Sequence, residues 1–408
     1  MLFAVMLLCA AAFAYVRLGG PLGSPPDGPP AAPDIVRVNQ SAQSIYFGDL
    51  SPEPSVGDLS FRLYGPGMGH GDRGASSAGP VNGTYLMEDV LPTVDLLFRD
   101  LNNDSAVSKG EYLTVQDTDG PLATGIWHLE MSYPGHAAGN VTFTFRVLPE
   151  GTSYQENVRV DFIDVGQGDA ELITTSDGKV VLIDAGTRSY STLLSYLQGR
   201  SVTALDAFIL THPDADHIGG ADEVLEQLEV RSVYHPGVPL PAQNTTTYRD
   251  FLAAAQAEGC PIFTDEDLDP GDYLNISVTE DFRLLTINAA ADDTNDASIV
   301  VRMTAESRSF LFTGDIGAEV EAWLVEHYSY DLDVDVLKAA HHGSRYSSSD
   351  EFLNAVTPDI AIIEVGAGNS YGHPHAEAVD RLTAHGATIV RTDLAGTYVI
   401  TVAGAVIS

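Results

Sequence analysis

A short stretch near the middle of the chain concentrates four side chains that commonly bind divalent metals. It reads Thr211-His-Pro-Asp-Ala-Asp-His-Ile-Gly-Gly220 and contains His212, Asp214, Asp216 and His217. Imidazoles and carboxylates packed this tightly repel one another or lose hydration unless a cation gathers them. Because the adjacent Asp216 and His217 can point in different directions, one loop can serve two metals. The stretch predicts a metal site, with an ordinary solvated loop as the alternative.

Two further groups of potential ligands follow apolar runs later in the chain. Phe310-Leu-Phe-Thr-Gly-Asp315 ends in a carboxylate, and Asp333-Val-Asp-Val-Leu-Lys-Ala-Ala-His-His342 ends in two imidazoles. Either run alone is a weak signal. Together with the first stretch they predict a binuclear site in which Asp315 bridges two cations.

Strands alternating with helical stretches must position these groups. The apolar runs at 158–165, 180–184 and 206–212 predict strands that end at polar residues. The helical patterns fall at 191–197, 221–228, 247–257, 318–327, 350–356 and 376–385. We therefore expect an α/β layer domain over residues 151–408, with its site at the strand ends.

The preceding residues 34–150 show short runs of alternating apolar residues between turn-forming clusters, which predicts a small all-β sandwich domain. One loop in it has the oxygen-ligand spacing of a structural calcium site, although Ser105 stands where that pattern has glycine. A polar turn is the alternative. The calcium ligands would be Asp100, Asn102, Asp104, Ala106, Ser108 and Glu111.

The beginning of the chain predicts export. Residues 1–16 are apolar, so 1–18 is interpreted as a signal peptide or an N-terminal membrane anchor, and 19–33 as a Pro/Gly linker. No Lys or Arg precedes the apolar run, so a true start further upstream stays open. We expect an extracellular or cell-surface protein, tethered to a membrane where the N-terminus is retained.

The charge is strongly acidic, with 57 Asp and Glu against 20 Lys and Arg, a formal net charge of −37. It excludes tight, sequence-reading nucleic-acid binding by a basic face. It favours a halophilic source, with an acidic secreted protein as the alternative. Divalent ions at a site can still supply the positive charge that a phosphate needs. Two cysteines exclude a disulfide framework.

Eight motifs in order resemble the metallo-β-lactamase superfamily and, within it, the hydrolase domain of the ComEC-type competence proteins. The resemblance covers about residues 157–403 and implies an αββα sandwich with metals at one edge of its facing sheets. The motifs are Asp161-Phe-Ile-Asp-Val-Gly-Gln-Gly-Asp-Ala170, Leu182-Ile-Asp-Ala-Gly186, the stretch 212–220, Asn295-Asp-Ala-Ser298, Thr313-Gly-Asp315, His341-His-Gly-Ser344, Asn369-Ser-Tyr-Gly-His-Pro374 and Thr392-Asp-Leu-Ala-Gly396.

The resemblance implies one or two divalent metal ions held by a defined set of side chains. Asp214 stands where most members have His, which favours Mn²⁺ or Mg²⁺ over Zn²⁺ at that site. Residues 295–298 occupy the place of the usual third ligand. ComEC-type domains share both departures, and manganese or zinc is expected. The implied ligands are His212 and Asp214 on one metal, Asp216 and His217 on the other, Asp315 between them, and His342 in preference to His341 on the second metal.

Other polar residues on neighbouring loops are expected to orient the ligands or to touch substrate. Asp184, at a strand end, is expected to orient the ligand loop, with a plain turn as the alternative. His373 is a candidate proton carrier, with a capped loop histidine as the alternative, and Tyr371 lies beside it in sequence. The remaining candidates are Asp164, Gln167, Asp169, Ser298, Ser344 and Asn369.

Two metals that ionise a shared water suit hydrolysis of an ester, amide or phosphodiester. The expected activity is that of an exported phosphodiesterase or nuclease that acts on DNA through a metal-activated hydroxide, with Asp216 or His373 carrying the proton. The partner is therefore nucleic acid or a small phosphodiester, and no protein partner is predicted. The alternatives are a hydrolase of small esters, lactones or cyclic nucleotides, and a non-catalytic surface binding protein with a vestigial metal site.

Overall fold

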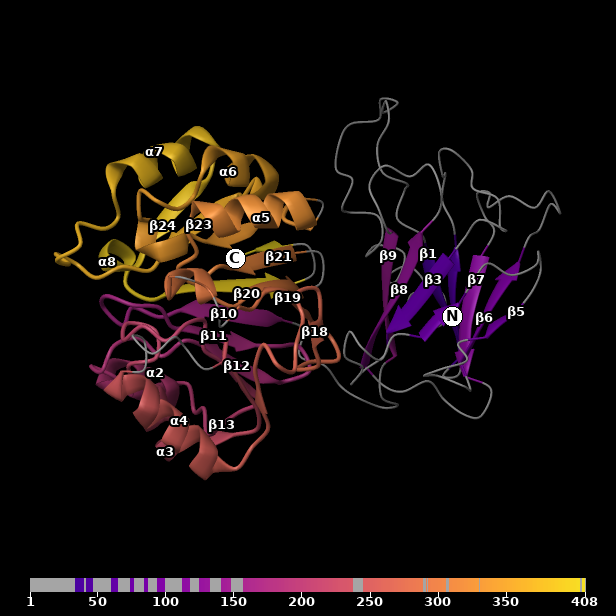
Figure 1. Ribbon diagram of the computed structural model, residues 1–408, viewed down its shortest axis with the longest axis horizontal. Coiled ribbons are helices and arrows are strands. Elements are labelled where there is room, and N and C mark those ends of the chain that lie inside the picture. Colours follow the sequence, from indigo (N-terminus) through magenta and orange to yellow (C-terminus); the bar gives the residue numbers. More distant parts are fainter. Residues whose placement is uncertain are drawn as a thin grey trace. The chain divides into compact units, whose positions relative to one another are not determined.

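The chain divides into two compact units, Met1–Thr152 and Ser153–Ser408 (Figure 1). The computed structural model describes nine strands between residues 34 and 147, and residues 157–407 apart from 238–244, 289–290, 292, 306–307, 330 and 404–405. The predicted signal or anchor, the linker and the calcium loop at 100–111 lie outside the described residues. In the described part of the chain, every helix is too short or too polar to cross a membrane.

The described strands of the first unit form two antiparallel sheets. The first has the order β1-β2-β7-β6-β5 and the second β4-β3-β8-β9. Trp127 and Leu129 of β8 are buried, as expected for alternate residues on one covered face. The strands are β1 (Asp34–Asn39), β2 (Ala42–Tyr46), β3 (Ser60–Tyr64), β4 (Gly74–Ser76), β5 (Thr84–Leu86), β6 (Val94–Arg99), β7 (Tyr112–Asp117), β8 (Gly125–Ser132) and β9 (Val141–Val147).

One of the two large sheets of the second unit has eight strands in the order β17-β16-β14-β12-β11-β10-β25-β26. Its strands are β10 (Val158–Phe162), β11 (Glu171–Thr174), β12 (Val180–Ile183), β14 (Ala207–Ile209), β16 (Val233–Tyr234), β17 (Ile262–Phe263), β25 (Tyr398–Ala403) and β26 (Val406–Ile407). A separate pair joins β13 (Ala204–Leu205) to β15 (Glu229–Val230). The helices α2 (Ser191–Gly199), α3 (Ala221–Gln227) and α4 (Thr246–Glu258) pack on its outer face.

The second sheet of this unit has seven strands in the order β18-β19-β20-β21-β22-β23-β24. They are β18 (Tyr273–Leu274), β19 (Asp281–Thr286), β20 (Val300–Ala305), β21 (Arg308–Phe312), β22 (Val336–Lys338), β23 (Ile360–Ile363) and β24 (Thr388–Arg391). The helices α5 (Ala318–Tyr328), α6 (Asp350–Val356) and α7 (Ala376–Ala384) cover it, and α8 (Thr392–Ala395) directly follows β24. Two 3-10 turns are η5 (Asn295–Ala297) and η6 (Ala340–Gly343).

Apolar side chains of the two sheets interdigitate to form the central core. Phe162 of β10 stacks on Phe312 of β21, with ring centroids 6.2 Å apart, and neither side chain reaches solvent. Figure 1 shows the two helical layers on opposite sides of the paired sheets. The predicted αββα sandwich is confirmed, and each of the six predicted helices forms with ends within two residues of the prediction.

The parallel strands of both sheets deliver polar loops to one edge of the sandwich. β12, β14 and β16 run parallel in one sheet, and β21, β22, β23 and β24 run parallel in the other. Loops after their carboxyl ends carry Asp184, the stretch 211–220, Asp315 and the His341–His342 pair. Layered α/β folds place ligand sites at such an edge.

Candidate metal centre

His217 is held so that one ring nitrogen remains available to a metal. Its Nδ1 lies 2.6 Å from Asp184 Oδ2, and both side chains are buried. Because the carboxylate accepts, Nδ1 carries a proton and Nε2 is the atom left to coordinate. This carboxylate–imidazole arrangement is typical of metal-binding histidines.

His212 is fixed in the same tautomer by a relay through Thr211. The Thr211 hydroxyl donates to Asp184 Oδ2 at 2.6 Å, so its oxygen accepts from His212 Nδ1 at 3.0 Å. The Thr211 backbone amide also donates to Asp184, at 2.8 Å. One buried carboxylate therefore orients two imidazoles from the same loop.

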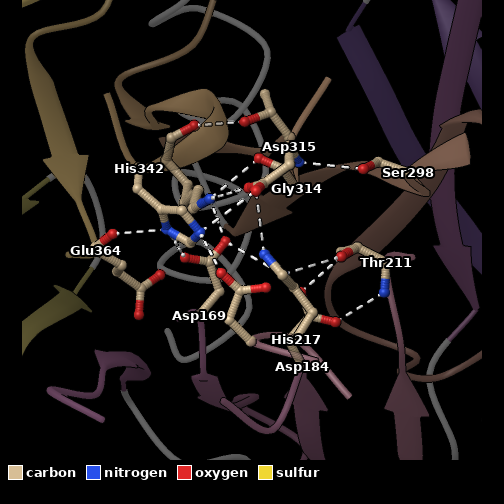
Figure 2. Close-up of polar contacts among 12 residues, drawn as sticks. Asp169, Asp184, Thr211, His217, Ser298, Gly314, Asp315, His342 and Glu364 are labelled. Atoms are coloured by element: carbon tan, nitrogen blue, oxygen red, sulfur yellow. Dashed lines mark hydrogen bonds and ion pairs between the residues drawn. The ribbon is translucent and has the colours of Figure 1, made fainter. Parts of the chain in front are cut away.

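His342 comes from the opposite sheet and has the same tautomer as His212 and His217. Its Nδ1 lies 2.9 Å from the carbonyl oxygen of Glu364, which can only accept, so Nδ1 donates. Its Nε2 lies 3.3 Å from both Asp216 Oδ2 and Asp315 Oδ2. Asp315 Oδ2 is also 3.3 Å from His217 Nε2, and Figure 2 shows it between the two rings. Asp315 therefore lies between imidazoles that come from different sheets.

The Nε2 atoms of His212, His217 and His342 are buried and lack a well-aligned hydrogen bond among the described residues. A buried polar atom without a hydrogen bond lowers the stability of the protein unless a ligand supplies the missing partner. Nitrogen and carboxylate donors converge here from both sheets, a set that suits a divalent transition metal such as manganese or zinc. The residues present therefore fit the metal centre that the motifs imply.

Charge in the cluster is balanced by protons where no cation is bound. Burial alone would lower the pKa of His342, but Asp315 and Asp169 outweigh it and raise that pKa to about 10. At His217, too, burial alone would lower the pKa, but Asp315 and Asp184 outweigh it and raise that pKa well above its usual range. Burial and the neighbouring His217 lower the pKa of His212 to about 3. A binding cation must displace the protons on the first two rings, because only neutral imidazole nitrogen ligates.

The loop after β22 has a strained backbone that presents His342. His341 and His342 both have left-handed conformations, with φ of 54° and 52°. Such positions cost on the order of 1 to 3 kcal/mol each and persist where the surrounding structure enforces them. Here Gly343 follows at φ 77°, and its carbonyl accepts from the His375 amide at 2.9 Å. The turn directs His342 into the cluster and His341 away from it.

A glycine brings the turn between β10 and β11 onto the ligand loop. Gly168 has φ of 133°, and a Cβ there would collide with the carbonyl oxygen of Asp216. The neighbouring amide of Asp169 donates to that same carbonyl at 3.3 Å. The turn therefore supports Asp216 through backbone contact that only glycine permits.

A family model of the metallo-beta-lactamase superfamily matches residues 163–366, which include every member of this cluster. The chain belongs to the metallo-beta-lactamase superfamily. The family identity and the fold agree with the resemblance found in the motifs.

The chain is similar to curated proteins over part of its length. ComE operon protein 3 of Bacillus subtilis is 33% identical over 259 residues, 58% of this chain and 32% of that protein. Competence protein ComA of Neisseria gonorrhoeae is 32% identical over 263 residues, 64% of this chain and 34% of that protein. The chain thus spans about a third of the length of these relatives.

Among solved structures, the chain is similar to the metallo hydrolase Igni18 from Ignicoccus hospitalis, which is 17% identical, with a TM-score of 0.37, and the match covers 59% of this chain and 98% of that chain.

Two predicted ligands lie at the margin of the superfamily site. Asp214 hydrogen-bonds Thr294, and its carboxylate still interacts electrostatically with His217. His341 lies outside the cluster, its ring 5.4 Å from that of His373. Burial and the charges of His342 and His341 lower the pKa of His373 to about 4. His373 is therefore uncharged near neutral pH.

Most of the remaining predicted residues support the loops. Asp164 Oδ1 accepts from the Gly166 amide at 3.1 Å, which stabilises its own turn. Gln167 Oε1 accepts from the Gly366 amide at 3.2 Å. Ser298 Oγ accepts from the Asp315 amide at 3.1 Å and so positions the bridging carboxylate. Ser344 accepts from Tyr346, and Asn369 bonds the backbone at both ends of its own loop.

Asp169 lies behind the two histidines. It contacts Nδ1 of His342 at 3.2 Å and Nδ1 of His217 at 3.6 Å, whereas Asp315 faces their Nε2 atoms. Donor atoms of Asp169, His217, Asp315 and His342 all lie within 4.8 Å of one another. Asp169 therefore faces the Nδ1 side of the two rings, and Asp315 faces their Nε2 side.

Sequence reasoning missed the buried charges beneath the cluster. Lys338 contacts Asp169 and donates to the Gly314 carbonyl at 3.1 Å. Glu171 and Glu364 lie against Asp169, and burial with mutual repulsion raises the pKa of Glu364 to about 8. A signal existed, because all three are charged residues in otherwise apolar strands or at their ends, where an ion must be paired or neutralised.

Proposed function

We propose that this protein is a metal-dependent phosphodiesterase that hydrolyses nucleic acid, with DNA as the preferred substrate. The observation that supports it most is that the buried Nε2 atoms of His217 and His342 both face Asp315, and that of His342 also faces Asp216. Divalent metals at such a site lower the pKa of bound water and polarise a phosphoryl oxygen. The name of one relative, competence protein ComA of Neisseria gonorrhoeae, favours DNA over other phosphodiesters.

The residues of this chain have distinct parts in the proposal. His212, His217, His342, Asp216 and Asp315 hold the metals, with Asp214 at the margin. Asp184, Thr211 and Asp169 keep the rings in the coordinating tautomer. His373, whose ring lies 6.1 Å from that of His342, is the proton carrier in this proposal.

The test is hydrolysis of an end-labelled single-stranded DNA by purified protein in Mn²⁺ and in Zn²⁺. His342→Ala should abolish cleavage, whereas His327→Ala, an exposed histidine on α5, is the matched control that retains it. Cleavage of a small phosphodiester but not DNA would favour the small-substrate hydrolase. Absence of bound metal by elemental analysis would favour the non-catalytic binding protein.

Export, a membrane tether and a saline environment are part of the same proposal. They rest on the apolar residues 1–16 and on the net charge of −37. Activity should persist in molar KCl, because salt screening reduces the range of the repulsion between the acidic surface and DNA to roughly 3 Å at 1 M. Loss of activity in molar KCl would contradict the saline assignment, and full-length protein found only in the cytoplasmic fraction would contradict export.

A further inference from the structure

Exposed apolar side chains gather on one edge of the second sheet. In the described part of the chain, the exposed large hydrophobic residues are Tyr346, Tyr371 and Leu394, at 73%, 62% and 76% of full exposure. They follow three neighbouring parallel strands, β22, β23 and β24 respectively. Single exposed apolar residues are ordinary. Their occurrence after three neighbouring parallel strands indicates a binding surface at the carboxyl ends of this sheet.

The two tyrosines lie on loops that are bonded to each other. The Arg345 amide donates to His375 Nδ1 at 3.2 Å, and the His375 amide donates to the Gly343 carbonyl at 2.9 Å. The Tyr371 ring stacks on His373, with centroids 5.8 Å apart and planes at 22°. The His373 ring lies 6.1 Å from that of His342. Tyr371 is therefore connected to the histidine cluster through the His373 ring.

Hydrogen bonds hold both loops in place while the tyrosine rings extend into solvent. Asn369 Oδ1 accepts from the amides of Tyr371 and His373, each at 3.1 Å. Arg381 donates to the carbonyls of Arg345, Ser347 and Ser348 at 2.7 to 2.9 Å. A surface ordered in advance loses less entropy when a ligand binds.

Cations at this surface are already engaged. Arg345 pairs with Glu377 at 2.9 Å, the Arg381 guanidinium bonds three carbonyls, and Lys338 is buried. Phosphate contacts alone therefore offer little affinity here. A ligand that gains affinity at this edge must do so through flat apolar groups rather than through its charge.

We propose that Tyr346 and Tyr371 form a stacking platform for the unpaired bases of a single-stranded nucleic acid, with Leu394 extending it along the edge. The inference rests on the proposed function and names its substrate class. Base stacking on aromatic side chains tolerates any sequence, and it needs bases that are not already stacked inside a duplex. It also tolerates salt, because it does not depend on charge.

The platform is tested by binding, so that hydrolysis is not required. The full chain is treated with chelator, and fluorescence anisotropy measures its affinity for labelled oligothymidylate, for an abasic strand of equal length and for the matching duplex. Tyr371→Ala and Tyr346→Ala should each weaken oligothymidylate binding by about 5- to 150-fold. Binding of the abasic strand should stay weak and unchanged.

Matched variants separate stacking from general damage. Tyr371→Phe and Tyr346→Phe should restore the preference for oligothymidylate, because the ring is kept. Gln227→Ala, an exposed residue of α3, should leave all three affinities unchanged. The platform is overturned if the alanine variants weaken both single strands equally or weaken neither, or if wild-type protein binds duplex as tightly as oligothymidylate. Stacking without Mn²⁺-dependent cleavage would overturn the proposed function alone.

Discussion

Lys338 and Asp169 form an ion pair beneath the metal centre in which both side chains are about 1% exposed. Asp169 in turn contacts the Nδ1 atoms of His217 and His342. Burial would raise the pKa of Asp169, but Lys338 and then His342 outweigh it and hold that carboxyl ionised. The ammonium therefore lets a carboxylate remain charged where it orients two imidazoles from different sheets.

Removing this ammonium alone should be costly. Lys338→Met keeps much of the side-chain volume but removes the ammonium partner of the buried Asp169 carboxylate, so the free energy of unfolding should fall by about 3 to 5 kcal/mol. Urea denaturation with chelator present measures it. The double variant Lys338→Met/Asp169→Asn should recover part of the loss. An equal or greater loss in the double variant would show that the charge pairing is not what stabilises this region.

Asp184 should control metal affinity from behind the ligands. Asp184→Asn removes the charge that fixes His217 and, through Thr211, His212. Loss of such a partner typically weakens metal binding by about 10- to 100-fold. Calorimetric titration of metal-free protein with Mn²⁺ measures the change.

Asp206→Asn is the matched control for Asp184. Like Asp184, Asp206 directly follows a strand, here β13 of the separate β13–β15 pair, and accepts from a backbone amide, that of Val180 at 3.0 Å, but it pairs with Lys179 and Arg231. Both variants should lose some stability, and only Asp184→Asn should lose affinity for Mn²⁺. Equal affinities in the two variants would remove Asp184 from the ligand support.

The two adjacent histidines should behave differently in metal binding. His342→Ala removes a ring whose Nε2 faces Asp216 and Asp315, whereas His341 faces His373. Elemental analysis after dialysis against Mn²⁺ should show less metal in His342→Ala and wild-type content in His341→Ala. The reverse pattern would move the ligand to His341.

Much of the fold and the local part of the site could be predicted from the sequence. Apolar runs and helical periods in the sequence predicted the strands and helices of each layer. They do so because an element that buries one face needs apolar residues at the spacing of that face. The stretch from His212 to His217 was recognisable because its groups are adjacent in sequence. Asp315 and His342 follow apolar strands that the same patterns predict.

The buried support could not be predicted in the same way. Lys338 and Asp169 are far apart in the sequence, and their pairing depends on how β22 of one sheet faces the β10–β11 turn of the other. The choice between His341 and His342 depends on two left-handed backbone positions, which residue type alone does not fix. Contacts between the sheets and backbone handedness are tertiary properties.

His235 should make the stability of the protein depend on pH. It is buried against Tyr248 and Phe251, and burial lowers its pKa to about 4. In the unfolded chain a histidine has a pKa near 6.5, so between about pH 6.5 and 4 the unfolded state binds a proton that the folded state does not. The contribution of His235 to the free energy of unfolding is therefore fully present above pH 6.5. It falls by about 3 kcal/mol as the pH is lowered from about 6.5 to 4. His235→Gln keeps an acceptor for the Gly237 amide and should flatten this dependence in urea denaturation at pH 7.5 and 4.5. His327→Gln, at an exposed site, is the control that should track wild type, and identical acid sensitivity in all three proteins would assign the dependence to other groups.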